Sequence, residues 1–167
     1  MTISMYSASV PVLTHALNNL KNVLTKGHEH AKAKGTDEAN YLELRLAPDM
    51  FTLARQVRIA CDVAKRGMAR LAGTEAPTHA DDETDFAALI ARCESVIDYL
   101  GTFKPEQIDS TEEKPITIQS PFGDLHFEGQ NYLFGFMIAN VHFHSSMTYA
   151  LLRNAGVEVG KRDYLGG

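Results

Sequence analysis

The sequence lacks both a long hydrophobic run and an excess of positive charge. No apolar stretch approaches the roughly 20 residues that a helix needs to cross a bilayer. Lys and Arg number 16 against 21 Asp and Glu, which leaves a net charge of -5. A chain without a basic field has little to attract the phosphates of nucleic acid or an anionic membrane surface. We therefore expect the protein to bind neither nucleic acid nor membranes.

Cysteine is also scarce, because the chain has only Cys61 and Cys93 and no CxxC pair. Each lies at or beside an apolar helical stripe, where a buried thiol is usually inert packing. The N-terminal stretch "MTISMYSASVPVL" has neither the basic segment nor the continuous apolar core of a secretory signal. These features favour a reducing, cytoplasmic setting.

Several short motifs of nucleotide-binding proteins and hydrolases are absent as well. The chain contains no G-x-x-x-x-G-K-S/T, G-x-G-x-x-G or G-x-S-x-G sequence. Nucleotide binding and nucleophilic hydrolysis therefore have no local support.

What the sequence does contain is helical periodicity. Its 167 residues, 44% of them hydrophobic, suffice for one compact core, so we expect residues 1–167 to form a single domain. Apolar side chains recur at steps of three and four in four segments. These predicted helices cover about 5–34, 50–72, 86–100 and 130–154, and end at Gly35, Gly73, Gly101 and Gly156. Asp49 is the expected cap of the second helix.

The segment between the third and fourth predicted helices has a different character. Pro105, Pro115 and Pro121 exclude a long helix, and "PITIQSPFGDLHFEG" alternates apolar and polar residues around a turn. This pattern predicts a small β-hairpin. Four amphipathic helices bury their stripes economically in a four-helix bundle. The predicted fold is all-α: a four-helix bundle with a β-hairpin in the connection between helices 3 and 4.

The charged residues of the second predicted helix lie mostly away from its apolar stripe. Asp62 follows Arg58 by four residues and precedes Arg66 by four, a spacing typical of exposed ion pairs. The arginines therefore do not predict a binding patch. His79 lies beside Pro77 and reads as a loop residue.

The fourth predicted helix carries polar residues on its inward face. With about 100° per residue from Leu133, both Asn140 and His144 fall within roughly 40° of the stripe centre, and His142 falls on the opposite side. Inward polar groups are costly unless they have partners. The pair is thus either a satisfied structural network or part of a ligand or metal pocket inside the bundle.

Two blocks, "NVHFHSSMTYALLRNAGVEVGKRDYLG" and "LRLAPDMFTLARQVRIACDVAK", resemble the DinB/YfiT-like superfamily, in particular its branch of uncharacterised domains. The resemblance covers nearly the whole chain and implies a DinB-like bundle that forms a homodimer. Many members hold a divalent metal with three histidines, one early in the second helix and an H-x-x-x-H pair on the fourth. By that resemblance the three positions are Gln56, Asn140 and His144.

Only His144 retains the histidine that the resemblance implies. Asn and Gln offer neutral carbonyl oxygens, which are weak ligands for Zn²⁺ or Ni²⁺. We predict Gln56, Asn140 and His144 to be ligand-binding residues, with His144 the candidate ligand if Zn or Ni is a cofactor. The expected function is that of a non-catalytic or small-molecule-binding homodimer with a polar pocket around His144. The alternative is a metal-dependent enzyme of the thiol-transferase or isomerase type.

Overall fold

The computed structural model describes residues 3–166 and is built around four long helices. Short helices, a two-stranded hairpin and a π-helical segment complete it. The elements are α1 (Val10–Lys34), α2 (Glu38–Leu42), α3 (Leu53–Ala72), α4 (Phe86–Leu100), α5 (Pro105–Ile108), β1 (Pro115–Ile118), β2 (Leu125–Glu128), α6 (Gly129–Asn131), η1 (Tyr132–Ile138), α7 (Ala139–Asn154) and α8 (Lys161–Leu165). The predicted bundle and its hairpin are confirmed.

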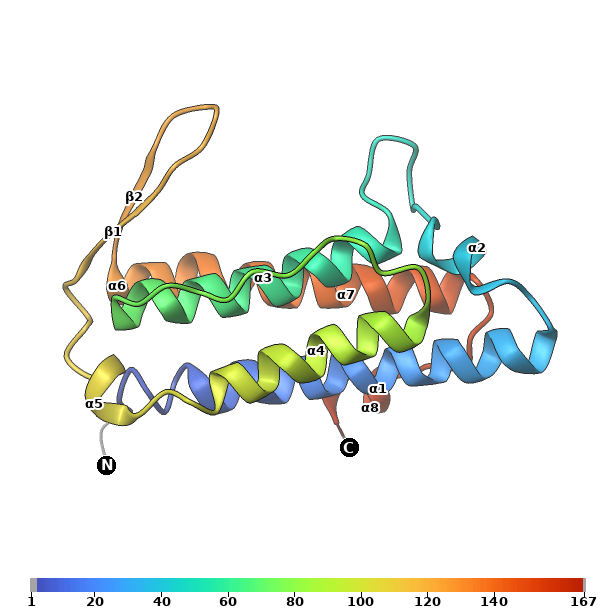
Figure 1. The fold of residues 1–167 in the computed structure, drawn as a ribbon, viewed down its shortest axis with the longest axis horizontal. Coiled ribbons are helices and arrows are strands. Elements are labelled where there is room, and N and C mark those ends of the chain that lie inside the picture. Colours follow the sequence, from blue (N-terminus) through green and yellow to red (C-terminus); the bar gives the residue numbers. More distant parts are fainter. Residues whose placement is uncertain (1–2, 167) are drawn as a thin grey trace.

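The four long helices pack in two layers (Figure 1). The α3 and α7 helices lie side by side, and α1 and α4 form the opposite layer. The α3 helix also contacts α4, so it has one interface with each neighbour. The antiparallel hairpin pairs Ile116 with Phe127 and projects from one end of the bundle (Figure 1). No helix in residues 3–166 is long and apolar enough to cross a membrane.

The ends of the long helices follow the local chemistry of the chain. The α1 and α3 helices end at Gly35 and Gly73, whose φ angles of 62° and 74° favour glycine because it has no Cβ. The start of α3 differs from the prediction. Thr52, not Asp49, is the cap, and its hydroxyl accepts a hydrogen bond from the Arg55 amide at 3.3 Å. The chain reaches Thr52 through turns, and the backbone at Thr52 is extended, as a cap requires.

The last long helix contains a π-helical segment, η1, which the periodicity did not predict. A π-helix closes i→i+5 hydrogen bonds and therefore turns less per residue than an α-helix. The buried positions consequently advance in steps of four from Leu133 to Met137 and Val141, and α7 continues with the adjacent buried residues His144 and Ser145. Val141 takes the inward place that an uninterrupted α-helix would give to Asn140, so the prediction that Asn140 points into the core is wrong.

Candidate functional site

Gln56 in the first turn of α3 and His144 in the middle of α7 meet across the interface of these two helices. The Nδ1 atom of His144 lies 2.6 Å from the Oε1 atom of Gln56. Both side chains are buried, with 2% of Gln56 and 7% of His144 exposed. The structure therefore brings together two of the three residues that the sequence selected.

The hydrogen bonds of Gln56 determine which nitrogen of His144 carries the proton. The Gln56 Nε2 atom donates to the carbonyl oxygen of Phe51 at 3.3 Å. A carbonyl oxygen only accepts, so the amide end must face Phe51 and the Oε1 end must face His144. The His144 Nδ1 atom is then the donor, and in the neutral ring the Nε2 atom keeps its lone pair.

The Nε2 atom of His144 has no hydrogen-bond partner within residues 3–166. In the same part of the chain, the fully enclosed polar side-chain atoms without a partner are Arg92 Nε and Ser145 Oγ, so His144 Nε2 keeps some contact with solvent. Burial lowers the pKa of His144, which favours the neutral ring. His144 thus offers a hydrogen-bond acceptor at the edge of the core.

Asn140, the third predicted residue, lies apart from this pair. It is half-buried, and its Nδ2 atom donates to the carbonyl oxygen of Phe136 at 2.7 Å, within its own helix. The hydrogen bond that an inward Asn140 would have needed is therefore made one turn back along the same helix. The cause is η1, which lowers the rotation per residue between Leu133 and Asn140. A prediction that assumes about 100° per residue from Leu133 therefore misplaces Asn140.

The donor set around His144 does not fit a resident Zn or Ni ion. The Oε1 atom of Gln56 is engaged by His144 Nδ1, so one imidazole nitrogen remains as a strong ligand. No group of three or more His, Cys, Asp or Glu side chains in the described chain could hold a metal ion. Asn140 and Gln56 supply neutral amides, which bind such ions weakly.

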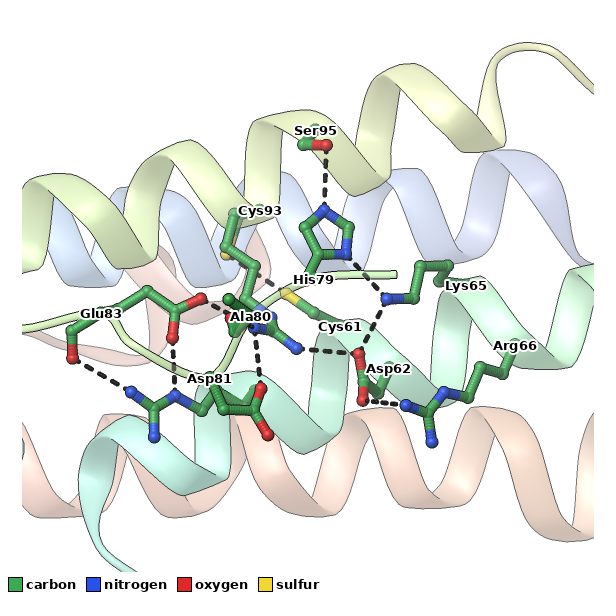
Figure 2. A network of polar contacts seen from close by, with 12 residues as sticks. Cys61, Asp62, Lys65, Arg66, His79, Ala80, Asp81, Glu83, Cys93 and Ser95 are labelled. Atoms are coloured by element: carbon green, nitrogen blue, oxygen red, sulfur yellow. Dashed lines mark hydrogen bonds and ion pairs between the residues drawn. The ribbon is translucent and has the colours of Figure 1, made fainter. Parts of the chain in front are cut away.

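A second polar cluster lies between α3 and α4, and the sequence did not predict it. The guanidinium of Arg92, with 3% of the residue exposed, donates to Asp62 at 2.9 Å, to Asp81 at 3.1 Å and to Glu83 at 2.7 Å. The Nζ atom of Lys65, a residue only 1% exposed, lies 3.0 Å from Asp62 (Figure 2). Both cations are buried, and carboxylates within hydrogen-bond distance balance their charges.

The cluster also fastens the extended segment 74–85 across α3 and α4. Lys65 donates to His79 Nδ1 at 2.7 Å, and the other ring nitrogen of His79 lies 3.1 Å from Ser95 Oγ (Figure 2). Arg58 pairs with Glu83 at 2.6 Å. The predicted pair of Arg58 with Asp62 is therefore wrong, whereas the pair of Arg66 with Asp62, at 3.0 Å, is confirmed.

Competing effects set the pKa values in this cluster. Burial raises the pKa of Asp62, but the hydrogen bond from Lys65 and the charges of Lys65, Arg66 and Arg92 outweigh it, and the net shift is downward. Burial and the charge of Lys65 lower the pKa of His79. The carboxylate therefore stays ionised and the imidazole neutral, which is the arrangement that best balances the two buried cations.

Two signals in the sequence could have revealed the cluster. Arg92 follows Leu89 by three residues and precedes Val96 by four, a spacing that places it on the buried side of α4. Lys65 is similarly placed, four residues after Cys61. Cys61 and Cys93 are buried as predicted, with their sulfur atoms 3.7 Å apart, and the hydrogen bond with Cys61 together with burial raises the pKa of Cys93.

Comparison with known proteins identifies relatives of the whole fold. The family model of a domain of unknown function, DUF1993, matches residues 5–165. Among solved structures, a DinB family member protein from Shewanella denitrificans matches with a TM-score of 0.87 and 40% sequence identity, covering 97% of this chain and 92% of that chain. No curated protein matches. These matches confirm the DinB-like fold and the family resemblance.

Proposed function

Starting from the DUF1993 family, to which this chain belongs, we propose that the protein is a non-catalytic homodimer that binds a small molecule at His144. The observation that carries the proposal is the unpartnered Nε2 atom of His144, whose ring is held in place by the 2.6 Å hydrogen bond to Gln56. A neutral imidazole fixed in this way accepts a hydrogen bond from an alcohol, amide or similar donor.

One further feature of α7 supports a ligand at this position. The ring of Phe143 lies 5.1 Å from the His144 ring at an interplanar angle of 86° and is about half exposed. An apolar ring beside a polar acceptor suits a small molecule with both kinds of surface.

The homodimer is proposed on exposed aromatic surface. Phe134 and Phe143 are 49% and 53% exposed on the outer side of η1 and α7, and Phe122 at the hairpin tip is fully exposed. Large apolar side chains exposed to solvent are typical of surfaces that associate. Sedimentation velocity tests this part of the proposal: we expect a dimer that weakens when Phe134 and Phe143 are both replaced by serine.

The binding proposal is tested by titrating ¹⁵N-labelled protein with acetamide and isopropanol, two neutral donors, and following the His144 ring and the Gln56 side-chain amide. We expect saturable shifts at both groups in the unmodified protein. In His144→Phe the Gln56 amide should no longer shift. His142→Phe is the matched control, because His142 is exposed on the same helix, and it should bind the probes like the unmodified protein. Shifts that persist in His144→Phe would place the binding elsewhere.

The competing function is a metal-dependent enzyme of the thiol-transferase or isomerase type. It predicts near-stoichiometric metal in protein purified without a histidine tag or chelator, lost in His144→Ala. We expect instead no stoichiometric Zn or Ni, even after incubation with either ion, because His144 is the one imidazole at the site. Elemental analysis of the two proteins decides between these outcomes.

A further inference from the structure

A cleft of about 240 Å³ lies between α3 and η1, where the first strand of the hairpin closes one side. Four apolar side chains form its walls, and two cationic side chains reach into it. These are Ile59, Val63, Ile118 and Phe136, with Arg66 and Arg70. The residues that line the cleft do not include Gln56, Asn140 or His144. Its cationic end is also distant from that site, because Arg70 lies 14 residues beyond Gln56 on α3, about 21 Å along the helix axis.

Arg70 carries a charge that no acidic side chain balances. Its Nη1 atom donates to the hydroxyl oxygen of Tyr132 at 3.2 Å, and no carboxylate lies within 4.0 Å of the guanidinium in the part of the chain that the structure describes. Tyr132 is fully buried, and burial raises its pKa, so it is a neutral partner. A half-buried guanidinium with only a neutral partner gains strongly from a counter-ion.

The end of α3 does not supply the missing negative charge. Basic side chains in the last turn of a helix often bind its free carbonyl groups. Here the Leu71 carbonyl accepts from Lys114 Nζ at 2.8 Å, and the Ala69 and Arg70 carbonyls accept from the backbone amides of residues 74 and 73. These acceptors are occupied by other donors, and Arg70 is left facing the cleft.

Arg66 adds to the positive charge of the cleft. Its carboxylate partner is Asp62, at 3.0 Å, which also binds the buried Lys65 at 3.0 Å and the buried Arg92 at 2.9 Å. One carboxylate is thus shared among three cations, and the Arg66 side chain is 57% exposed. The cleft therefore presents two guanidinium groups beside an apolar wall, with Asp62 as the acidic side chain that lines it.

The π-helical turn positions the remaining parts of the cleft. The rings of Tyr132 and Phe136 are stacked, 5.7 Å apart with an interplanar angle of 17°. Both rings line the cleft, and the hydroxyl of Tyr132 accepts the hydrogen bond from Arg70. Wide helical turns of this kind are often found at functional sites.

We propose that this cleft binds a small monocarboxylate with an aromatic or branched apolar body. The carboxylate contacts the free N–H groups of Arg70 and Arg66, and the apolar body lies against Phe136 and Ile118. Tyr132 acts as a positioning residue for Arg70. The volume corresponds to roughly eight water molecules, so a compact ligand of about nine non-hydrogen atoms fits best.

Sodium benzoate is the probe, and benzamide is its neutral control of the same size. We expect benzoate to cause saturable shifts in the ¹H–¹⁵N spectrum at α3, η1 and the Arg70 side chain, at concentrations where benzamide and inorganic phosphate cause none. Arg70→Gln should weaken benzoate binding at least tenfold, which is about 1.4 kcal/mol. Arg55→Gln, an exposed arginine at the other end of α3, is the matched control and should leave the affinity unchanged.

Two further variants make the test independent of any effect on folding. Ile118→Asp places a carboxylate at the cleft from the hairpin, outside the helical core, and should abolish benzoate binding while the helical signal stays constant. Tyr132→Phe should weaken binding about threefold, less than Arg70→Gln, because it frees the guanidinium without removing it. Equal binding of benzamide or phosphate, or benzoate shifts that survive both Arg70→Gln and Ile118→Asp, would overturn the proposal.

Discussion

The two interfaces of α3 treat their polar groups in opposite ways. Toward α4, the guanidinium of Arg92 and the ammonium of Lys65 are enclosed, and each has acidic partners at hydrogen-bond distance. Toward α7 and η1, His144 keeps an unpartnered nitrogen and Arg70 has only a neutral phenol as partner. The first interface contains far more buried charge, yet the second holds the groups that are free to bind something.

This difference teaches that buried charge alone does not identify a binding site. The cluster around Arg92 contains more buried charge, but carboxylates balance its cations, and it holds the segment 74–85 against α3 and α4. Arg92 Nε has no partner within residues 3–166, but it is fully enclosed and out of reach of a ligand. The interface of α3 with α7 contains less buried charge. Its His144 Nε2 atom has no partner within residues 3–166 and keeps contact with solvent. Unused hydrogen-bonding positions that solvent can reach, rather than buried charge, therefore favour a binding role over a structural one.

The largest effect is expected at the interface of α3 with α4. Arg92→Ala leaves Asp62 and Glu83 partly buried with fewer partners, so we expect the free energy of unfolding to fall by about 3–5 kcal/mol. Arg66→Ala, which breaks an exposed pair with the same Asp62, should cost less than about 1 kcal/mol. Urea unfolding of the three proteins measures both values. A loss below about 1 kcal/mol in Arg92→Ala would mean that the cluster does not stabilise the fold.

A smaller effect is expected from pH. Burial lowers the pKa of His144 in the folded state, so below the ordinary histidine pKa of 6.5 the unfolded chain takes up a proton that the folded chain does not. The contribution of His144 to the free energy of unfolding is therefore fully present above pH 6.5. It is lost as the pH falls toward the lower pKa of His144 in the folded state. His79 contributes with the same sign.

The measurement is urea unfolding at a series of pH values between about 7.5 and 5, a range that spans the ordinary histidine pKa. We expect the unfolding free energy of the unmodified protein to decrease through this range, and the decrease to be shallower in His144→Phe and in His79→Gln. An identical slope in His144→Phe would show that His144 titrates normally.

The sequence predicts the fold well because the fold depends on patterns that repeat along whole helices. An error of a few residues at a helix end does not change such a pattern. The apolar stripes, the terminal glycines Gly35 and Gly73 and the hairpin between two turns all belong to that kind of signal. The start of α3 was misplaced by three residues, from Asp49 to Thr52, since either side chain can cap a helix and only the backbone path selects one.

The placement of the candidate site residues was predicted in part, for a reason that the helix geometry explains. His144 was correctly placed on the buried side, and its partner Gln56 was correctly paired with it. The predicted inward orientation of Asn140 was wrong because η1 changes the rotation per residue. A π-helix has no characteristic residue type from which it could be predicted. The Arg92 cluster was missed because the spacing of Asp62 and Arg66 along α3 is the same for an exposed and a buried ion pair. The buried-side positions of Arg92 on α4 and Lys65 on α3 were the signals that could have revealed it.

The central claim is that His144 is a neutral ring whose Nδ1 atom is bound to Gln56 and whose Nε2 atom is free to accept. A long-range ¹H–¹⁵N correlation spectrum of the histidine side chains near pH 7 tests it most directly, with His144→Phe to assign the signals. We expect His144 to be protonated at Nδ1, and in Gln56→Leu we expect both neutral tautomers, as in a ring without a fixed hydrogen-bond partner. A ring protonated at Nε2, or at both nitrogens at neutral pH, would contradict it.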